Sequence, residues 1–149
     1  MVKATARGRI VFHALKRSVP GWSAGLTVPE VAKLYPGTIP GDFFTDPLPP
    51  ADLYSVGRIL HDWSDEKILR LLTKIYAALP AGGGLLIAEK LLEPGYVSAH
   101  MQSLNMLVNA EGRERSAAEY QALLCAAGFS EAECKVTGAY LDAILATKK

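Results

Sequence analysis

The sequence has few of the features that mark disulfide-rich, zinc-binding or membrane-embedded proteins. Only Cys125 and Cys134 are cysteines, and no metal-ligand spacing surrounds them, so neither a disulfide framework nor a zinc site is expected. No apolar run approaches the roughly 20 residues that cross a bilayer. We expect both thiols to be reduced and packed as small hydrophobic side chains, as in a cytoplasmic protein.

A dominant charge is also missing. Sixteen basic and fifteen acidic residues leave a formal net charge of +1, so no strong field favours nucleic acid or an acidic membrane surface as a partner. Half of the residues are hydrophobic. In a chain of 149 residues that is enough for the core of one domain.

Acidic residues are absent from the first 29 positions, where five basic residues occur. This composition indicates an atypical basic leader over residues 1–25, without a fold of its own. A mitochondrial transit peptide is the alternative, whereas a secretory signal would need an apolar segment that is missing here. The folded domain is therefore expected over residues 26–149.

The middle of the chain predicts a strand, a helix and a second strand. Residues 51–60 are rich in β-formers. Ser64 suits a helix N-cap, and apolar residues then recur at helical spacing until the breaker cluster 80–84. The apolar run 85–88 is typical of a strand buried on both faces of a parallel sheet. Together these segments predict a βαβ unit.

Two more helices and a strand pair are predicted further on. Residues 97–109 have an apolar side, and a capping box formed by Ser116 and Glu119 begins a helix that ends at Gly128. Residues 133–136 and 141–147 are weaker strand candidates. The expected fold is α/β, with a mainly parallel sheet and a terminal antiparallel β-pair.

Polar residues at strand ends are the first candidates for a site. His61 follows the first strand and Glu89 ends the second, where open α/β sheets bind ligands. His61 could act as a base near neutral pH, or be a loop histidine bonded to backbone. Glu89 could orient a base, or be a partly solvated strand end, which residue spacing alone slightly favours.

Other polar residues are less informative by themselves. Asn105 lies near the apolar side of its helix and would need partners if buried, whereas Glu114 between Arg113 and Arg115 is typical of an exposed ion-pair cluster. The glycines at 82–84 follow a helix, so they indicate a turn rather than a phosphate loop. The pattern of a hydrolase nucleophile elbow is missing. Composition and spacing therefore identify no reaction.

An ordered series of motifs resembles a known family. The motifs are Gly-Asp-Phe-Phe at 41–44, Asp-Pro-Leu-Pro at 46–49, Ala-Asp-Leu-Tyr at 51–54, Arg-Ile-Leu-His-Asp-Trp at 58–63, Ser-Leu-Asn-Met-Leu-Val at 103–108, Glu-Gly-Arg-Glu-Arg at 111–115, Ala-Gly-Phe at 127–129 and Asp-Ala-Ile-Leu-Ala at 142–146. From Leu26 to Lys149 the chain resembles the acetylserotonin O-methyltransferase family and, more distantly, plant caffeate-type O-methyltransferases.

The resemblance implies a Rossmann-like domain that uses S-adenosylmethionine. His61 resembles the general base that deprotonates the substrate hydroxyl, and Glu89 and Glu114 resemble the acidic pair that orients this base. Asp62 would support the base or contact substrate. No metal is required by this chemistry.

The same resemblance implies the binding residues. Asp42 and Phe43 resemble contacts on the adenine side of the cofactor, and Arg58 a contact near its methionine end. Asn105 and Asn109 fall where the family lines the pocket for a small aromatic hydroxyl substrate, by resemblance N-acetylserotonin, which is converted to melatonin.

The match also has gaps. The family's Asp-Leu-Gly-Gly-Gly-x-Gly turn and its dimerisation domain have no counterpart in this sequence, and Thr27 stands where the family places the acid that binds the cofactor ribose. The chain therefore resembles a truncated methyltransferase domain, although the family is homodimeric. We expect weak cofactor binding and little activity, with a non-catalytic fragment that acts as a binding or interaction module as the alternative.

Overall fold

The computed structural model describes residues 11–15, 23–27, 38–130 and 132–149. Its elements in chain order are β1 (Val11–Leu15), β2 (Ser23–Thr27), β3 (Thr38–Pro40), β4 (Leu53–Gly57), the short 3-10 helix η1 (Leu60–Asp62), α2 (Asp65–Ala78), β5 (Gly84–Glu89), α3 (Val97–Asn109), α4 (Ala117–Ala126), β6 (Ala132–Lys135) and β7 (Asp142–Thr147). The strand, helix and strand predicted between 51 and 88 are all present.

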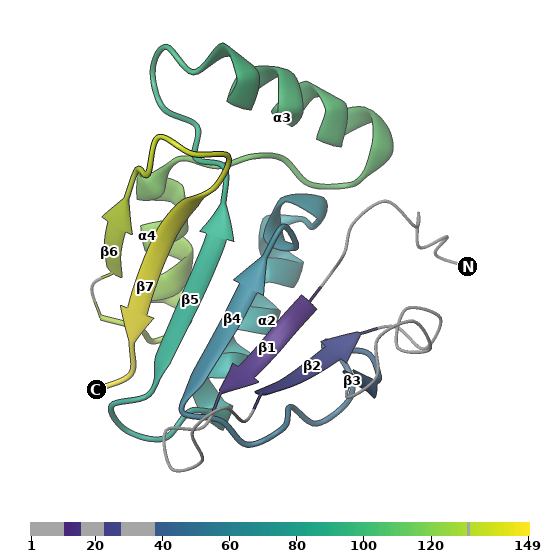
Figure 1. The fold of residues 1–149 in the computed structure, drawn as a ribbon, viewed down its shortest axis with the longest axis vertical. Helices are drawn as coiled ribbons and strands as arrows, with labels where there is room; N and C mark the ends of the chain where they lie inside the picture. Colours follow the sequence, from purple (N-terminus) through teal and green to yellow (C-terminus); the bar gives the residue numbers. More distant parts are fainter. Residues whose placement is uncertain (1–10, 16–22, 28–37, 131) are drawn as a thin grey trace.

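The strands form one mixed sheet in the order β3-β2-β1-β4-β5-β7-β6 (Figure 1). Only β2–β3 and β4–β5 are parallel, and the other four pairs are antiparallel. The α/β class and the terminal antiparallel pair β6–β7 are confirmed. The expectation of a mainly parallel sheet was wrong, because β1 runs antiparallel to both of its neighbours.

Part of the basic N-terminal segment belongs to this sheet. β1 lies wholly within residues 1–25, and β2 crosses the boundary predicted at residue 25. The remainder of that segment lies outside the described residues. The sequence could not show this, because strand pairing depends on a partner far along the chain.

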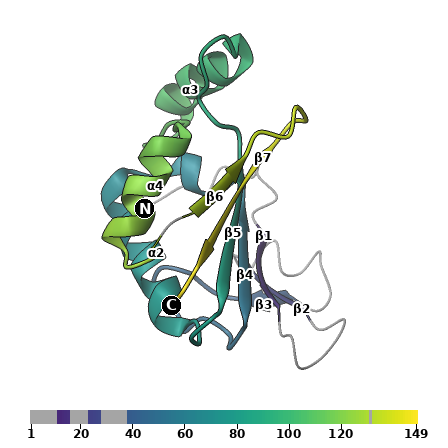
Figure 2. The same ribbon diagram turned by 90° about the vertical axis from the view of Figure 1, so that its left-hand side faces the viewer.

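One face of the sheet carries the core. Figure 2 shows α2 and α4 together on one side of the strands. The buried positions alternate along β4, β5 and β7, with Tyr54, Val56, Leu85, Ile87 and Ile144 at or below 1% exposure, as expected when one face is covered. Residues 85–88 were therefore wrongly predicted to be buried on both faces: Leu86 and Ala88 are only half-buried.

The two core helices begin where the sequence predicts. Ser64 is the N-cap of α2, although its side chain makes no capping hydrogen bond. At the start of α4, Ser116 and Glu119 form the complete predicted capping box. Gly128 then ends this helix at φ 105°, a conformation that favours glycine, with the ring of Tyr76 against it.

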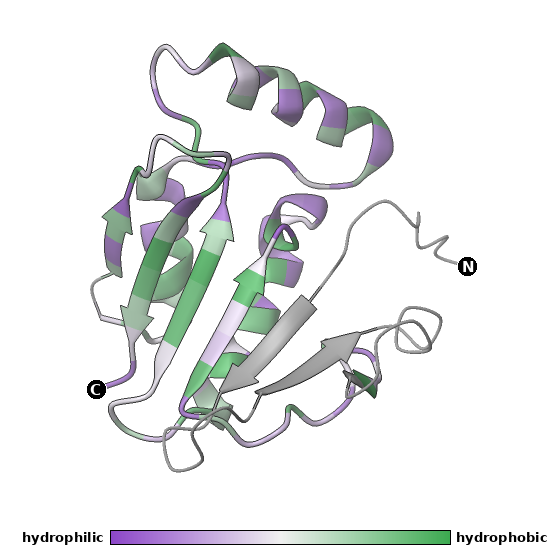
Figure 3. Ribbon diagram, viewed as in Figure 1, coloured by the Kyte–Doolittle hydropathy of each residue, from purple (hydrophilic) through white to green (hydrophobic). Residues whose placement is uncertain are grey.

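Helix α3 is present at its predicted bounds, but its apolar side is exposed. Only Ala99 and Met106 of this helix are buried. Five large apolar side chains of the helix are exposed instead: Val97, Met101, Leu104, Leu107 and Val108. Figures 1 and 3 show this helix beyond the ends of the central strands β4 and β5. Periodicity predicts that a helix has an apolar face, but not what covers it.

Two further observations concern the cysteines and the length of the helices. Cys125 and Cys134 are free thiols, but both are exposed, so they are not packed in the core as expected. Among the helices of the described residues, none combines the length and apolarity needed to cross a membrane.

The two N-cap serines give a stability test. We expect Ser116→Ala to lower the free energy of unfolding by about 1 kcal/mol, because a capping hydrogen bond is lost. Ser64→Ala is the matched control and should cost clearly less, since the Ser64 side chain caps nothing. Urea denaturation of both variants measures the difference, and an equal or reversed order would contradict the assignment of the caps.

Candidate active site

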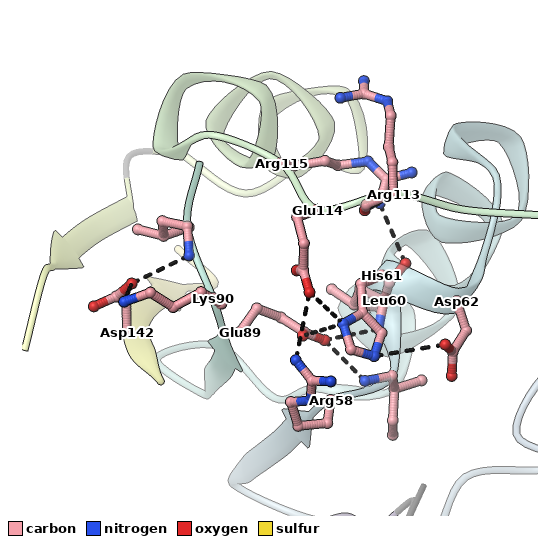
Figure 4. A network of polar contacts seen from close by, with 12 residues as sticks. Arg58, Leu60, His61, Asp62, Glu89, Lys90, Arg113, Glu114, Arg115 and Asp142 are labelled. Atoms are coloured by element: carbon pink, nitrogen blue, oxygen red, sulfur yellow. Dashed lines mark hydrogen bonds and ion pairs between the residues drawn. The ribbon is translucent and has the colours of Figure 1, made fainter. Parts of the chain in front are cut away.

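Three titratable side chains meet above the carboxyl ends of β4 and β5. His61 lies in η1, Glu89 is the last residue of β5, and Glu114 comes from the segment between α3 and α4. All three are at most 3% exposed. Figure 4 shows them pointing toward one another. This confirms that the residues predicted at the strand ends share one location.

The backbone after β4 is shaped to present the histidine. Arg58 adopts φ 55°, an uncommon conformation for a residue with a side chain, and its N–H donates to the carbonyl of Ala88. The chain then turns so that Ile59 and Leu60 both donate their N–H groups to Glu89 Oε1 at 2.8 Å. Glu89 therefore fixes the segment that enters η1.

The imidazole of His61 is held by its Nδ1 atom. Nδ1 lies 2.9 Å from Glu114 Oε1 and 3.5 Å from Glu89 Oε2. A carboxylate can only accept, so Nδ1 carries the proton and donates to Glu114. In the neutral ring Nε2 then keeps its lone pair, which is the arrangement a general base requires.

Burial and charge act in opposite directions on these groups. Burial lowers the pKa of His61, but the hydrogen bond to Glu114 and the charges of Glu89 and Glu114 outweigh it, so the pKa stands above its usual value. Arg58 opposes them only slightly. Burial raises the pKa of Glu89. The charge of His61 and the two backbone N–H bonds lower it, but by less. The carboxylates thus favour a protonated imidazole.

Asp62 lies on the other side of the ring. Its Oδ1 is 3.5 Å from His61 Nε2, and its side chain is 32% exposed. Burial raises the pKa of Asp62, partly offset by the charges of His61 and Arg58. The carboxylate is placed to stabilise the ring once Nε2 has gained a proton.

Arg58 connects this cluster to a cavity. Its Nη1 lies 3.4 Å from Glu114 Oε1, and its guanidinium is over the ring of Tyr140. Arg58, Lys90, Tyr96 and Tyr140 are among the residues that line a cavity of about 300 Å³. Arg58 therefore lines the cavity with part of its side chain and pairs with the buried Glu114.

The cluster also has the composition of a cation site. One donor atom from each of His61, Glu89 and Glu114 lies within 4.8 Å of the others. Nδ1 of His61 is already bonded to Glu114, however, and Glu89 Oε1 accepts two N–H groups. The donors are arranged to orient the imidazole, and we interpret the cluster as a hydrogen-bonded base.

The residues predicted on the adenine side lie in a tight turn outside this cluster. Asp42 Oδ1 accepts from the N–H of Phe44 at 2.8 Å. Phe43 belongs to the hydrophobic core and is 6% exposed. Phe44 packs edge-on against Trp63, which places the turn beside the segment that follows His61.

The surroundings of Asn105 and Glu114 are now defined, and the expectation for Glu114 is corrected. Asn105 is exposed, and it accepts a hydrogen bond from Asn109 Nδ2 at 2.8 Å on the same exposed helix. Glu114 is fully buried rather than part of an exposed ion-pair cluster. Arg115 was expected only as a member of that exposed cluster, and its burial at 1% exposure was not predicted. A buried arginine beside the site leaves no signal in spacing or periodicity.

Comparison with known proteins shows the family to which this fold belongs. A family model for the O-methyltransferase domain matches residues 32–130. Bovine acetylserotonin O-methyltransferase is 52% identical over 72% of this chain and 32% of its own length. A human probable bifunctional dTTP/UTP pyrophosphatase/methyltransferase protein is also 52% identical, over 72% of this chain and 18% of its own.

Solved structures agree. Human N-acetylserotonin methyltransferase in complex with SAM superposes with a TM-score of 0.80 at 45% identity, covering 84% of this chain and 40% of that one. A family 2 O-methyltransferase from Planctomyces limnophilus in complex with apigenin gives 0.76 at 33% identity, covering 85% and 43%. The fold is thus a Rossmann-like methyltransferase fold, and the chain belongs to this O-methyltransferase family. It spans about a third of the length of the acetylserotonin O-methyltransferases it matches.

The raised pKa of His61 predicts a pH dependence of stability. A histidine with a higher pKa in the folded state stabilises the fold fully below its unfolded pKa of about 6.5, and this contribution is lost as pH rises through the folded pKa. Urea denaturation from pH 5.5 to 8.5 should show the free energy of unfolding of the native chain falling relative to His61→Gln. His100→Gln is the control at an exposed histidine, and a constant difference for His61→Gln would contradict the pKa direction.

Proposed function

We propose that this chain carries the general-base side of an S-adenosylmethionine-dependent O-methyltransferase that acts on the hydroxyl of a small aromatic molecule. The observation that supports this most directly is the buried His61, whose Nδ1 donates to Glu114 and whose Nε2 is left to accept a proton. The family and the names of its relatives support the reaction class.

The proposed role of His61 follows from the chemistry of the acceptor. A phenolic hydroxyl has a pKa near 10 and is a weak nucleophile at neutral pH. Nε2 removes its proton as the oxygen forms a bond to the methyl carbon, a contribution of typically 10²–10⁴-fold. When bound, S-adenosylmethionine supplies a methyl group already activated by the positive sulfur.

Glu89 and Glu114 are proposed to hold the base in position and to stabilise its charged form. Each carboxylate lies within 3.5 Å of Nδ1 and is shielded from water. As Nε2 gains a proton, the attraction between imidazolium and carboxylates grows, because charges interact strongly where water is excluded. Asp62 adds a partly exposed negative charge at the Nε2 side.

The described residues fit the cofactor only at one end. Arg58, with a side chain 24% exposed, lies beside the base and is proposed to contact the methionine end. At the adenine end, Phe43 is buried in the core and one oxygen of Asp42 caps its own turn. The family's Asp-Leu-Gly-Gly-Gly-x-Gly turn has no counterpart in this sequence, and Thr27 stands where the family places the acid that binds the ribose. A charge-assisted contact is therefore missing, which weakens binding.

N-acetylserotonin is the proposed acceptor, by likeness to the relatives named for it. Asn105 and Asn109 are proposed to lie at the acceptor side, since α3 presents both amides on its surface.

A non-catalytic binding or interaction module is the alternative. Two observations favour it: one face of the sheet is uncovered by any described helix, and α3 exposes a row of apolar side chains. Both surfaces suit contact with other protein, and activity would then not be expected from this chain by itself.

Calorimetric titration tests the cofactor side of this proposal. We expect the purified 149-residue chain to give no saturable heat with S-adenosylmethionine below about 1 mM, because the ribose and glycine-turn contacts are missing. Circular dichroism confirms that the sample is folded. A dissociation constant in the micromolar range would contradict the expected weakness.

Methyl transfer tests the role of His61. With radiolabelled S-adenosylmethionine in excess, any turnover of N-acetylserotonin should fall by about 10²–10⁴-fold in His61→Ala, because the proton acceptor is removed. His100→Ala, at an exposed histidine, should leave the rate unchanged. Turnover that survives His61→Ala would show that another group is the base, and a folded chain without turnover would support the binding module.

A further inference from the structure

An arginine is buried next to the histidine segment, in addition to the two buried acids. Arg115 is only 1% exposed, although an isolated buried charge is very costly. Its cost is offset because all three nitrogens of the guanidinium donate. Nε and Nη2 reach Asp65 Oδ1 at 2.7 and 2.6 Å, and Nη1 reaches the carbonyl of Arg113 at 2.9 Å.

Two further bonds of Arg115 enclose the histidine segment. Nη1 donates to the carbonyl of Leu60 at 3.2 Å, and Nη2 donates to the carbonyl of Trp63 at 2.9 Å. These carbonyls lie on either side of the pair His61–Asp62 in the chain. The guanidinium is a rigid planar fork, so it fixes the two carbonyls relative to each other. Because peptide groups are planar, this restricts the backbone between them.

Gly112 holds the same segment by close approach. A Cβ atom at this position would overlap the carbonyl oxygen of His61 and lie 2.5 Å from the nitrogen of Trp63 and 2.7 Å from the carbonyl carbon of Asp62. Real Cβ atoms do not come this close to backbone atoms, so any larger residue would displace the histidine segment. The segment 112–115 thus contacts residues 60–63 through the backbone of Gly112 and the side chains of Glu114 and Arg115.

We propose that Arg115 and Gly112 are positioning residues, which hold the backbone of His61 so that its ring stays bonded to Glu114 with Nε2 directed toward the acceptor. The inference rests on the proposed function, since the direction of the ring matters for catalysis only if His61 is the base. Arg115 touches neither the ring nor a reacting atom, so it acts through the backbone.

A purely structural role for Arg115 makes a different prediction. Its bonds to Asp65 at the start of α2 could serve only to join the 112–115 segment to that helix. Loss of such a joint would lower stability but leave the His61 ring unchanged. The two roles are therefore separated by a measurement on the ring itself.

Nitrogen-15 NMR of the imidazoles makes this measurement on the full chain without any ligand. Arg115→Lys keeps the charge but not the fork. In this variant the Nδ1 proton of His61 should exchange with water roughly tenfold faster, as expected when a charge-assisted hydrogen bond loosens. The pKa of His61 should fall toward its usual value. Glu89, Glu114, Asp62 and Arg58, the charged groups that act on the ring, remain in place.

Arg113→Lys is the matched control. The Arg113 side chain is 38% exposed, pairs with Glu119 and more distantly with Asp65 Oδ2, and its ion pairs include none with the histidine segment. It should leave the His61 signals unchanged. An unchanged His61 ring in a folded Arg115→Lys protein would overturn the proposal. If Arg115→Lys does not fold, Asp65→Ala is measured instead, since it removes the carboxylate that binds the Arg115 guanidinium. An unchanged His61 ring in this variant would likewise overturn the proposal. Glu66→Ala is its control on the same exposed helix turn.

The NMR result does not depend on methyl transfer. A ring that responds to Arg115→Lys in a chain without turnover supports the positioning role and contradicts the proposed activity. Turnover that depends on His61, with a ring that does not respond to Arg115→Lys, supports the proposed activity and overturns the positioning role.

Discussion

The whole site depends on keeping two carboxylates buried side by side. Glu89 and Glu114 are each at most 1% exposed, and like charges in such surroundings repel strongly. Their charge is balanced from three directions: two backbone N–H groups, the imidazole of His61, and Arg58. Each of these comes from the turn that follows β4. The acids and that turn therefore stabilise each other, and neither arrangement would persist alone.

This mutual dependence explains the uncommon backbone of Arg58. A left-handed residue with a side chain costs free energy, but it turns two successive N–H groups toward one oxygen of Glu89. The histidine that follows is then directed at the acids. A strained backbone conformation persists where the surrounding contacts stabilise it. Such positions are frequent at functional sites.

Much of the local structure could be predicted from sequence, because its causes are local. The strand before His61, the bounds of α2 and α3, and the capping box of Ser116 all follow from short-range preferences. The position of His61 at a strand end came from the same reasoning. The shared location with Glu89 then followed from the parallel pairing of β4 with β5.

The errors came from long-range contacts. Glu114 stands between two arginines in the sequence, and nothing nearby shows that it enters the protein while Arg113 stays outside. The apolar side of α3 is a property of the helix alone, whereas its exposure depends on what else packs there. Likewise, the direction of β1 is set by its neighbours in the sheet. Each depends on distant segments that spacing does not describe.

The alignment of β4 with β5 has a consequence for folding fidelity. Gly57 faces Ala88 across the strands, and Glu89 follows directly at the end of β5. A slip of one residue would turn the Glu89 side chain to the opposite face of the sheet, and the N–H groups of Ile59 and Leu60 would lose their acceptor. In a sheet with the wrong register, Glu89 could not hold the segment that carries His61. An ordered His61 ring therefore indicates that β4 and β5 are paired in the native register.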